Sequence, residues 1–166
     1  VAADADVPPF SRAAMDGYAV RAADTNGASR QSPVVLPCIA QTFTGQVPNS
    51  SVGPAQCIEV AAGAPLPPGA AAVLILEDTA ADDGTPKGVP YGTSYGTPEG
   101  VPYEGGDVRV FASVQPLQNI GRQGADISRG QTVLRAGTFL NASRAGALSA
   151  LGLTNVEVYA KPRVAI

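Results

Sequence analysis

The acidic residues of this sequence are its best candidates for chemistry, because its 166 residues include no histidine. Without an imidazole, the usual general base and the Ser-His and Cys-His nucleophile arrangements are excluded. Asp16 comes before a glycine, Glu77 ends a long apolar run, and Asp126 lies in a polar turn. Any reaction must therefore use carboxylates, Lys, Arg, Tyr or backbone groups.

Each of these carboxylates also has a purely structural interpretation. Asp16 can cap the turn at Gly17, and Glu77 can be the solvated end of a strand. Asp126 can pair with Arg122 across a turn, an exposed ion pair worth at most about 1 kcal/mol. The residue types alone leave a catalytic and a structural role open for all three.

Two other kinds of site are excluded. Cys38 and Cys57 cannot form a zinc site, since zinc needs about four ligands and no histidine completes the set; we expect two small buried or half-buried thiols. The segment 63–69 is rich in glycine and proline. It lacks the Gly-Lys-Ser/Thr ending of a P-loop and does not fit the dinucleotide fingerprint.

The composition indicates a globular domain, with 45% hydrophobic and 15% charged residues. A net charge of −3 argues against a nucleic-acid partner, which requires clustered Lys and Arg. No window approaches the length of apolar sequence that spans a membrane, and the start does not resemble a signal peptide. We expect a cytoplasmic location. The lone methionine, Met15, and the apolar end indicate a fragment of a longer protein.

The elements that must position the carboxylates are predicted to be short strands, because 19 glycines and 15 prolines interrupt the chain. Pro37 predicts that one of these strands is bent or lies at a sheet edge. We expect a polar turn at 119–127 and no doubly wound sheet. The strand-like runs are 18–20, 34–43, 57–60, 71–76, 108–114, 132–140, 156–159 and 164–166.

One helix is predicted, starting at the N-cap Asn141 and ending at Gly152. Apolar residues follow a helical spacing between these two positions. The segment 79–107 is of low complexity and contains the near repeat GVPYG and GVPYE. We predict that residues 80–107 are mobile and dispensable for folding.

Four segments, in their order along the chain, resemble the molybdopterin molybdenumtransferase family of bacterial MoeA, plant insertases and gephyrin. The family's PPF…MDGYAVR signature is similar to residues 8–21, and its TGAP-P-GADAV…ED signature to 62–78. Its NIR-GxDI signature resembles 119–127, and its ending PRVAI stands within 146–166. The resemblance covers the chain apart from 22–55 and 79–107.

Four positions depart from the family pattern. Ala62 stands where the family usually has threonine, so a hydroxyl is lost. Ala71 replaces an aspartate, and Ala125 replaces a residue that is often acidic. Gly121 replaces a residue that is commonly basic.

The resemblance implies an α+β, β-rich fold. A discontinuous mixed α/β domain, 1–17 with 128–166, would carry an inserted β domain, 18–127. It also implies a longer, homodimeric protein whose cofactor-binding domain follows this chain. The implied reaction transfers molybdenum from molybdate to adenylylated molybdopterin, with Mg²⁺ and release of AMP.

The resemblance implies site residues as well. Asp16 and Asp126 are predicted catalytic and Mg²⁺-binding residues that lie close together. Glu77, Arg122 and Gly63 are predicted to contact the cofactor. The chain alone is expected to be inactive. Two alternatives stay open, a gephyrin-like scaffold and a separate β module that binds a carbohydrate or peptide.

Overall fold

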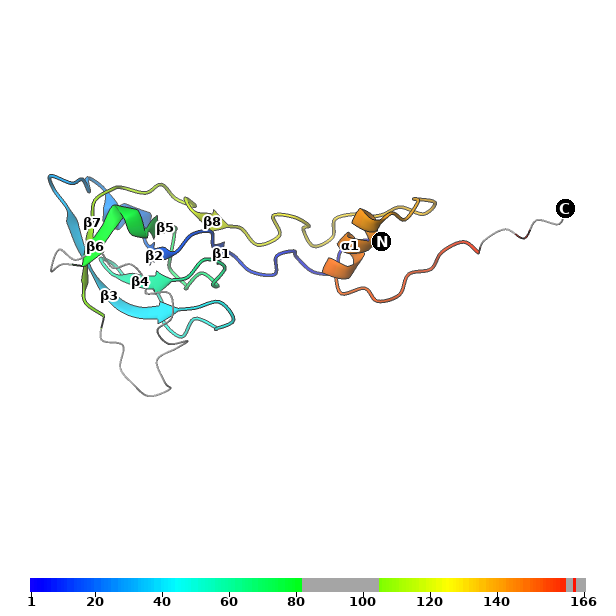
Figure 1. The fold of residues 1–166 in the computed structure, drawn as a ribbon, viewed down its shortest axis with the longest axis horizontal. Helices are drawn as coiled ribbons and strands as arrows, with labels where there is room; N and C mark the ends of the chain where they lie inside the picture. The colour runs from blue at the N-terminus through cyan, green and yellow to red at the C-terminus, as the bar shows by residue number, and fades with distance from the viewer. Residues whose placement is uncertain (82–104, 161–162, 164–166) are drawn as a thin grey trace. The chain divides into compact units, whose positions relative to one another are not determined.

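The computed structural model describes residues 1–81, 105–160 and 163 (Figure 1). By compactness, the chain divides into a central unit, Phe10–Arg122, and a terminal unit that joins Val1–Pro9 to Gln123–Ile166. The domain limits predicted at 17/18 and 127/128 stay a prediction, because compactness does not define evolutionary domains.

The central unit is built on a six-stranded sheet in the order β5-β2-β4-β3-β7-β6 (Figure 1). Its neighbouring strands are antiparallel except β3 and β4, which run parallel. In the described residues its elements are strands, most of them short as the frequent glycines and prolines predict, and two 3-10 helices. They are β1 Arg12–Ala13, β2 Gly17–Val20, η1 Ala22–Thr25, β3 Val34–Thr42, β4 Cys57–Val60, β5 Ala72–Ile75, η2 Leu76–Asp78, β6 Thr79–Ala81, β7 Asp107–Val110 and β8 Ile120–Gly121.

The sheet buries side chains on both faces. Along β2, Tyr18 and Val20 pack into one cluster, while Ala19 between them packs into the other. Leu74 and Ile58, both fully buried, belong to opposite clusters. Burial of each stabilises the fold by roughly 1.5–3 kcal/mol, because a large apolar surface leaves water. Sequence reasoning correctly predicted the buried strands in this region.

The position of β3 overturns one of the two alternatives predicted from Pro37, an edge strand, and does not contradict the other, a bent strand. The strand β3 is not an edge strand, because it pairs with β7 along its first half and with β4 along its second half. Pro37 is the last residue paired with β7, opposite Asp107. The register with β4 shifts between Cys38 and Gln41. A residue without a backbone N–H is tolerated here because the strand exchanges partners at this point.

The terminal unit contains the predicted helix, α1 Ala142–Ala150. The side chain of Asn141 accepts a hydrogen bond of 2.9 Å from the backbone N–H of Arg144, the expected N-cap. Gly152 follows with a φ of 75°, the left-handed conformation that ends helices. Both helix signals in the sequence are confirmed.

Several strand predictions need correction. No strand forms at 132–140 or 156–159, where the described residues show one isolated bridge, Ala2 to Thr132. An extended segment cannot form a strand without a partner to complete its ladder. The expected polar turn contains the two-residue strand β8, and β7 ends before 111–114.

The remaining sequence predictions include segments that lie outside the described residues. These are 82–104, within the predicted mobile segment, and the expected last strand at 164–166. In the described part of the chain, no helix has the length and apolarity needed to cross a membrane.

Candidate active site

Three strand ends of the central unit meet beside Asp16. The next residue, Gly17, begins β2 and pairs with Val60 at the end of β4 and with Ile75 at the end of β5. Because both neighbours are antiparallel to β2, the residues just beyond them lie at the same end of the sheet as Asp16. Glu77, two positions past Ile75, is among these residues. The register therefore brings two predicted site carboxylates to one end of the sheet.

The Asp16 side chain reaches across the sequence to the turn that follows β4. Its Oδ1 accepts a hydrogen bond of 2.9 Å from the backbone N–H of Ala62. The residue itself remains exposed. The alternative interpretation is that Asp16 caps its own turn at Gly17. In the structure its side chain instead caps the turn at Ala62, 46 positions away. A carboxylate that is anchored and yet accessible can bind a ligand with little loss of side-chain freedom.

The turn at Gly63 is held from several sides. Gly63 has a φ of 83° and donates its N–H to the Ala13 carbonyl at 2.8 Å. Ala13 in turn donates to the Ala64 carbonyl at 3.0 Å. The Thr44 hydroxyl donates to the Ala62 carbonyl at 3.0 Å. These bonds fix the Ala62 N–H that holds Asp16, so the predicted residue Gly63 supports the site through the backbone.

Gly17 sets how closely the strands approach behind Asp16. A Cβ added to this glycine would lie 1.7 Å from the Leu74 carbonyl oxygen on β5. No side chain can occupy that space, since the obstacle is backbone. Asp16 is thus attached to a point where the backbones of β2 and β5 approach each other closely.

Burial also fixes the next residue along β2. Tyr18 is 1% exposed. Burial raises the pKa of its hydroxyl, and the Glu59 carboxylate adds to the rise. Tyr18 therefore remains a neutral phenol at ordinary pH and packs in the core. Asp16, two positions earlier, is exposed to solvent.

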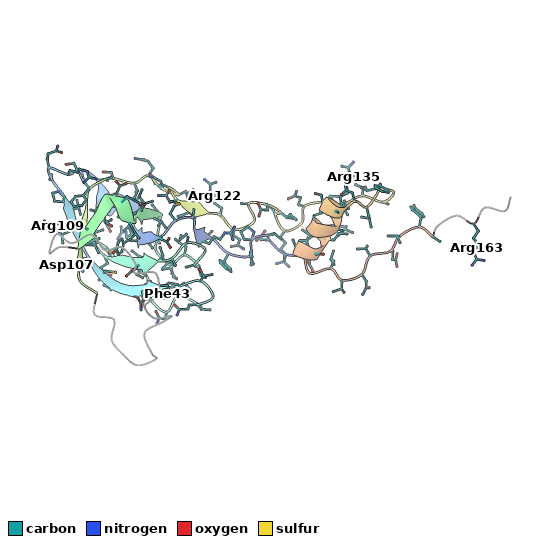
Figure 2. All side chains as sticks on the ribbon, viewed as in Figure 1. Phe43, Asp107, Arg109, Arg122, Arg135 and Arg163 are labelled. Carbon is teal, nitrogen blue, oxygen red and sulfur yellow. The ribbon has the colours of Figure 1, made fainter. Side chains whose placement is uncertain are left out.

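The predicted residue Arg122 is exposed and follows β8, which pairs with β1 (Figure 2). The same pairing identifies a residue that sequence reasoning missed, Arg12, which is opposite Gly121. A Cβ added to Gly121 would lie 3.3 Å from Arg12 Cγ and 3.5 Å from its Nε. The arginine side chain therefore lies over the glycine. Arg12 can be identified as a neighbour of Gly121 only when the pairing of β1 with β8 is known.

Asp126 belongs to the terminal unit, whereas Asp16 belongs to the central unit. Asp126 is exposed, and its backbone N–H donates to the Val7 carbonyl at 2.9 Å. The predicted proximity of Asp126 to Asp16 and its alternative pairing with Arg122 both stay predictions. The structure therefore brings Asp16, Gly63 and Glu77 to one sheet end and describes Asp126 separately.

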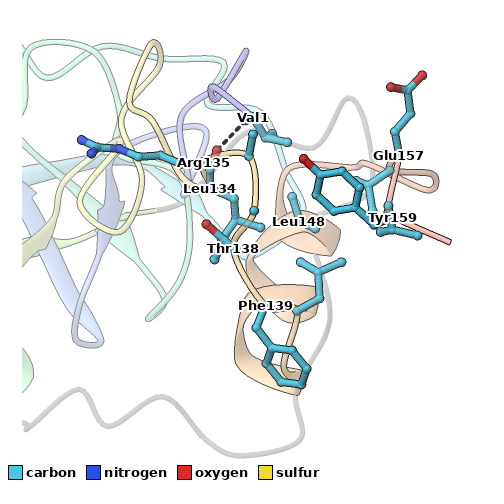
Figure 3. A pocket seen from close by; sticks show the side chains of 13 residues that line it. Val1, Leu134, Arg135, Thr138, Phe139, Leu148, Glu157 and Tyr159 are labelled. Atoms are coloured by element: carbon cyan, nitrogen blue, oxygen red, sulfur yellow. Dashed lines mark hydrogen bonds between the residues drawn. The ribbon is translucent and has the colours of Figure 1, made fainter. Parts of the chain in front are cut away.

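A cavity of about 940 Å³ lies in the terminal unit (Figure 3). Its wall includes Leu134, Phe139, Leu148 and Tyr159, and the Val1 ammonium donates to the Leu134 carbonyl at its rim. None of the predicted site residues lines it. The carboxylates predicted from the sequence therefore belong to exposed surfaces of their units.

Comparison with known proteins agrees with this arrangement of signatures. Residues 1–152 match the family model of the MoeA N-terminal region, described as domains I and II. The chain belongs to this family.

Individual relatives support the assignment. The chain is 32% identical to molybdopterin molybdenumtransferase 2 of Mycobacterium tuberculosis, covering 100% of this chain and 36% of that protein. It is 33% identical to molybdopterin molybdenumtransferase of Bacillus subtilis, covering 100% and 34%. A crystal structure of the MoeA protein of Pyrococcus horikoshii OT3 superposes with a TM-score of 0.72 at 34% identity, covering 92% and 35%. The chain thus spans about a third of the length of these relatives.

Proposed function

We propose that this chain is the N-terminal part of a molybdenum insertase. The whole protein would transfer molybdenum from molybdate to the dithiolene of adenylylated molybdopterin and release AMP. The match of residues 1–152 to the MoeA N-terminal region supports the proposal. So do the relatives, which are molybdopterin molybdenumtransferases. The observation that carries it is Asp16, which is exposed and held by the Ala62 N–H at the convergence of three strand ends.

The donor set around Asp16 suits Mg²⁺. This ion is commonly bound through one or two carboxylates together with phosphate oxygens and water. Asp16 offers an exposed carboxylate, and Glu77 adds a second at the same end of the sheet. The described residues contain no group of three or more His, Cys, Asp or Glu that could hold a metal without other ligands. A site completed by the substrate's own oxygens is therefore the arrangement we propose.

When bound, Mg²⁺ would neutralise charge on the pyrophosphate linkage of the nucleotide. The chain's own residues would orient the Asp16 carboxylate and bind the anionic substrate. The Ala62 N–H holds one oxygen of Asp16, which orients the carboxylate toward an approaching ligand. Arg12 and Arg122, both exposed beside the β1–β8 pair, supply positive charge for an anion such as molybdate or phosphate.

The proposal is tested by comparing this chain with a protein extended by the C-terminal segments found in its relatives. Both are incubated with molybdate, Mg²⁺ and adenylylated molybdopterin, and AMP release and mature cofactor are measured. We expect turnover by the extended protein and none by the 166-residue chain. Turnover by the short chain would show that the complete site lies within it, and inactivity of a folded extended protein would contradict the proposal. The homodimer and the cytoplasmic location stay predictions.

A further inference from the structure

The side chain of Asp6 joins both ends of the loop that carries Asp126. Asp6 Oδ2 accepts a hydrogen bond of 2.8 Å from Gln123 Nε2, and Oδ1 accepts one of 2.8 Å from the Arg129 backbone N–H. The partners are 117 and 123 positions away in the sequence. One carboxylate thus closes the loop 123–129 on the N-terminal segment.

The residues after Asp6 fix the backbone inside this loop. The Val7 carbonyl accepts hydrogen bonds from the N–H groups of Asp126 at 2.9 Å and Ile127 at 3.1 Å. The Pro8 carbonyl accepts one from Gly124 at 3.0 Å. The Asp126 amide is therefore held directly, and Asp6 locks the two ends of the segment on either side of it.

Gly124 shows how closely the loop fits around Asp6. Its φ is 67°, and an added Cβ would lie 2.9 Å from Asp6 Oδ1. A side chain there would be strained and would also displace the carboxylate. The hydrogen bond from the Arg129 backbone lowers the pKa of Asp6 most, and the hydrogen bond from the Gln123 side chain lowers it further. The ionised form is therefore the one that binds the loop.

We propose that Asp6 is a positioning residue for Asp126, holding the loop 123–129 so that the exposed Asp126 carboxylate keeps the orientation required for molybdenum insertion. This inference rests on the proposed function. Both oxygens of Asp6 are engaged by the loop, so its effect on the reaction passes through Asp126. Asp126 uses its backbone for anchoring and leaves its carboxylate at the exposed surface.

The first test measures amide hydrogen exchange in the 166-residue chain. Asp6→Ala should accelerate exchange at Asp126 and Ile127, because the loop loses both side-chain bonds. Asp4→Ala, a matched loss of an exposed aspartate on the same segment, should leave these amides unchanged. Unchanged exchange in Asp6→Ala would overturn the inference, since Asp6 would then not hold the loop.

The second test measures the insertion rate in the extended protein. Asp6→Ala should lower kcat about tenfold, because the loop that carries Asp126 loses both of its side-chain hydrogen bonds to Asp6. In an Asp126→Asn background the same change should cause no further loss, because the group being positioned is already lost. An equal loss in both backgrounds would overturn the inference.

Two outcomes distinguish failure of the inference from failure of the proposed function. If Asp126→Asn reacts at the parental rate, the catalytic role predicted for Asp126 from the sequence is wrong and the inference falls with it. If Asp126→Asn is slow but Asp6→Ala is not, the inference alone is wrong. Asp6→Asn can keep both hydrogen bonds if the Gln123 amide turns over, and should retain most of the rate. A loss equal to that of Asp6→Ala, with exchange at Asp126 and Ile127 unchanged, would show that the charge itself acts on the reaction and would overturn the positioning role.

Discussion

The central and terminal units are stabilised in different ways. The central unit encloses most of the buried apolar side chains on the two faces of a sheet. Among its described residues, the terminal unit has few buried apolar side chains, one of which is Leu148 at 4% exposure, and it leaves Phe139 79% and Tyr159 84% exposed. Its described segments are joined largely by backbone hydrogen bonds and by the Asp6 side chain. Substitutions in the central unit should therefore cost more stability than equivalent ones in the terminal unit.

This difference also separates two ways of holding a carboxylate. Asp16 directly precedes Gly17, the first residue of a strand embedded in a packed sheet, so core packing fixes its position. Asp126 lies in a loop that depends on hydrogen bonds to residues 6–8. The position of Asp126 should respond to changes in single polar groups, whereas that of Asp16 should not.

The largest effect is expected from Gly17→Ala in the central unit. Its Cβ would lie 1.7 Å from the Leu74 carbonyl oxygen, so β2 and β5 must separate. We expect a loss of more than about 4 kcal/mol in the free energy of unfolding, measured by urea denaturation at central-unit amides. The control is Gly146→Ala in α1, which meets nothing within 4 Å and should stabilise the helix by about 0.5–1 kcal/mol. Equal changes in the free energy of unfolding for Gly17→Ala and Gly146→Ala would contradict the proposed difference between the two units.

Two leucines provide a matched comparison of packing. Leu74→Ala should cost about 3 kcal/mol, because Leu74 is fully buried in a continuous cluster. Leu148→Ala should cost about 1–2 kcal/mol, since Leu148 lines the open cavity and loses fewer contacts. Urea unfolding followed separately at amides of each unit measures both values. A larger loss for Leu148→Ala would mean that the terminal unit has the tighter core.

Removing the helix N-cap should have a smaller effect. Asn141→Ala leaves the Arg144 N–H without its side-chain acceptor and should destabilise α1 by about 1 kcal/mol. Hydrogen exchange at Arg144 and circular dichroism of the helix are the readouts. Asn155→Ala, an exposed asparagine outside the helix, is the control and should leave both unchanged. Unaltered exchange in Asn141→Ala would refute the cap.

The smallest predicted effect is the pH dependence of Asp6. Its pKa is lowered below the ordinary value of 3.8 in the folded chain, so its contribution to stability is present above that value. It is lost as pH falls through the folded pKa, because the protonated group binds the loop less well. Thermal unfolding of the terminal unit between about pH 2 and 5 should show this loss, and Asp6→Asn should reduce it. An identical pH profile for the two proteins would contradict this interpretation.

Local signals in the sequence predicted local structure well. Asn141 and Gly152 marked the helix ends, and the apolar runs around Val20, Ile58 and Leu74 marked buried strands. The failures all involve distant partners. The run 132–140 is predicted to be mostly strand but finds no neighbouring strand among the described residues, and the position of β3 inside the sheet depends on pairing with β7.

In the candidate site, too, local features could be predicted from the sequence, whereas contacts between distant segments could not. The place of Asp16 in a signature that resembles the family's identified it in the sequence. Its hydrogen bond to Ala62 and the placement of Arg12 over Gly121 required the pairing of distant segments. The capping role of Asp6 was also hidden, since its partners lie more than a hundred positions away.

The most direct test of the account is the insertion rate of the extended protein with two substitutions at Asp16. Asp16→Asn keeps an acceptor for the Ala62 N–H and removes the charge, whereas Asp16→Ala removes both. We predict that both lower kcat by at least about a hundredfold, because the charge serves the reaction, while Asp16→Asn retains the parental melting temperature. A parental rate for Asp16→Asn, with activity lost only in Asp16→Ala, would show that Asp16 merely caps a turn and would contradict the account.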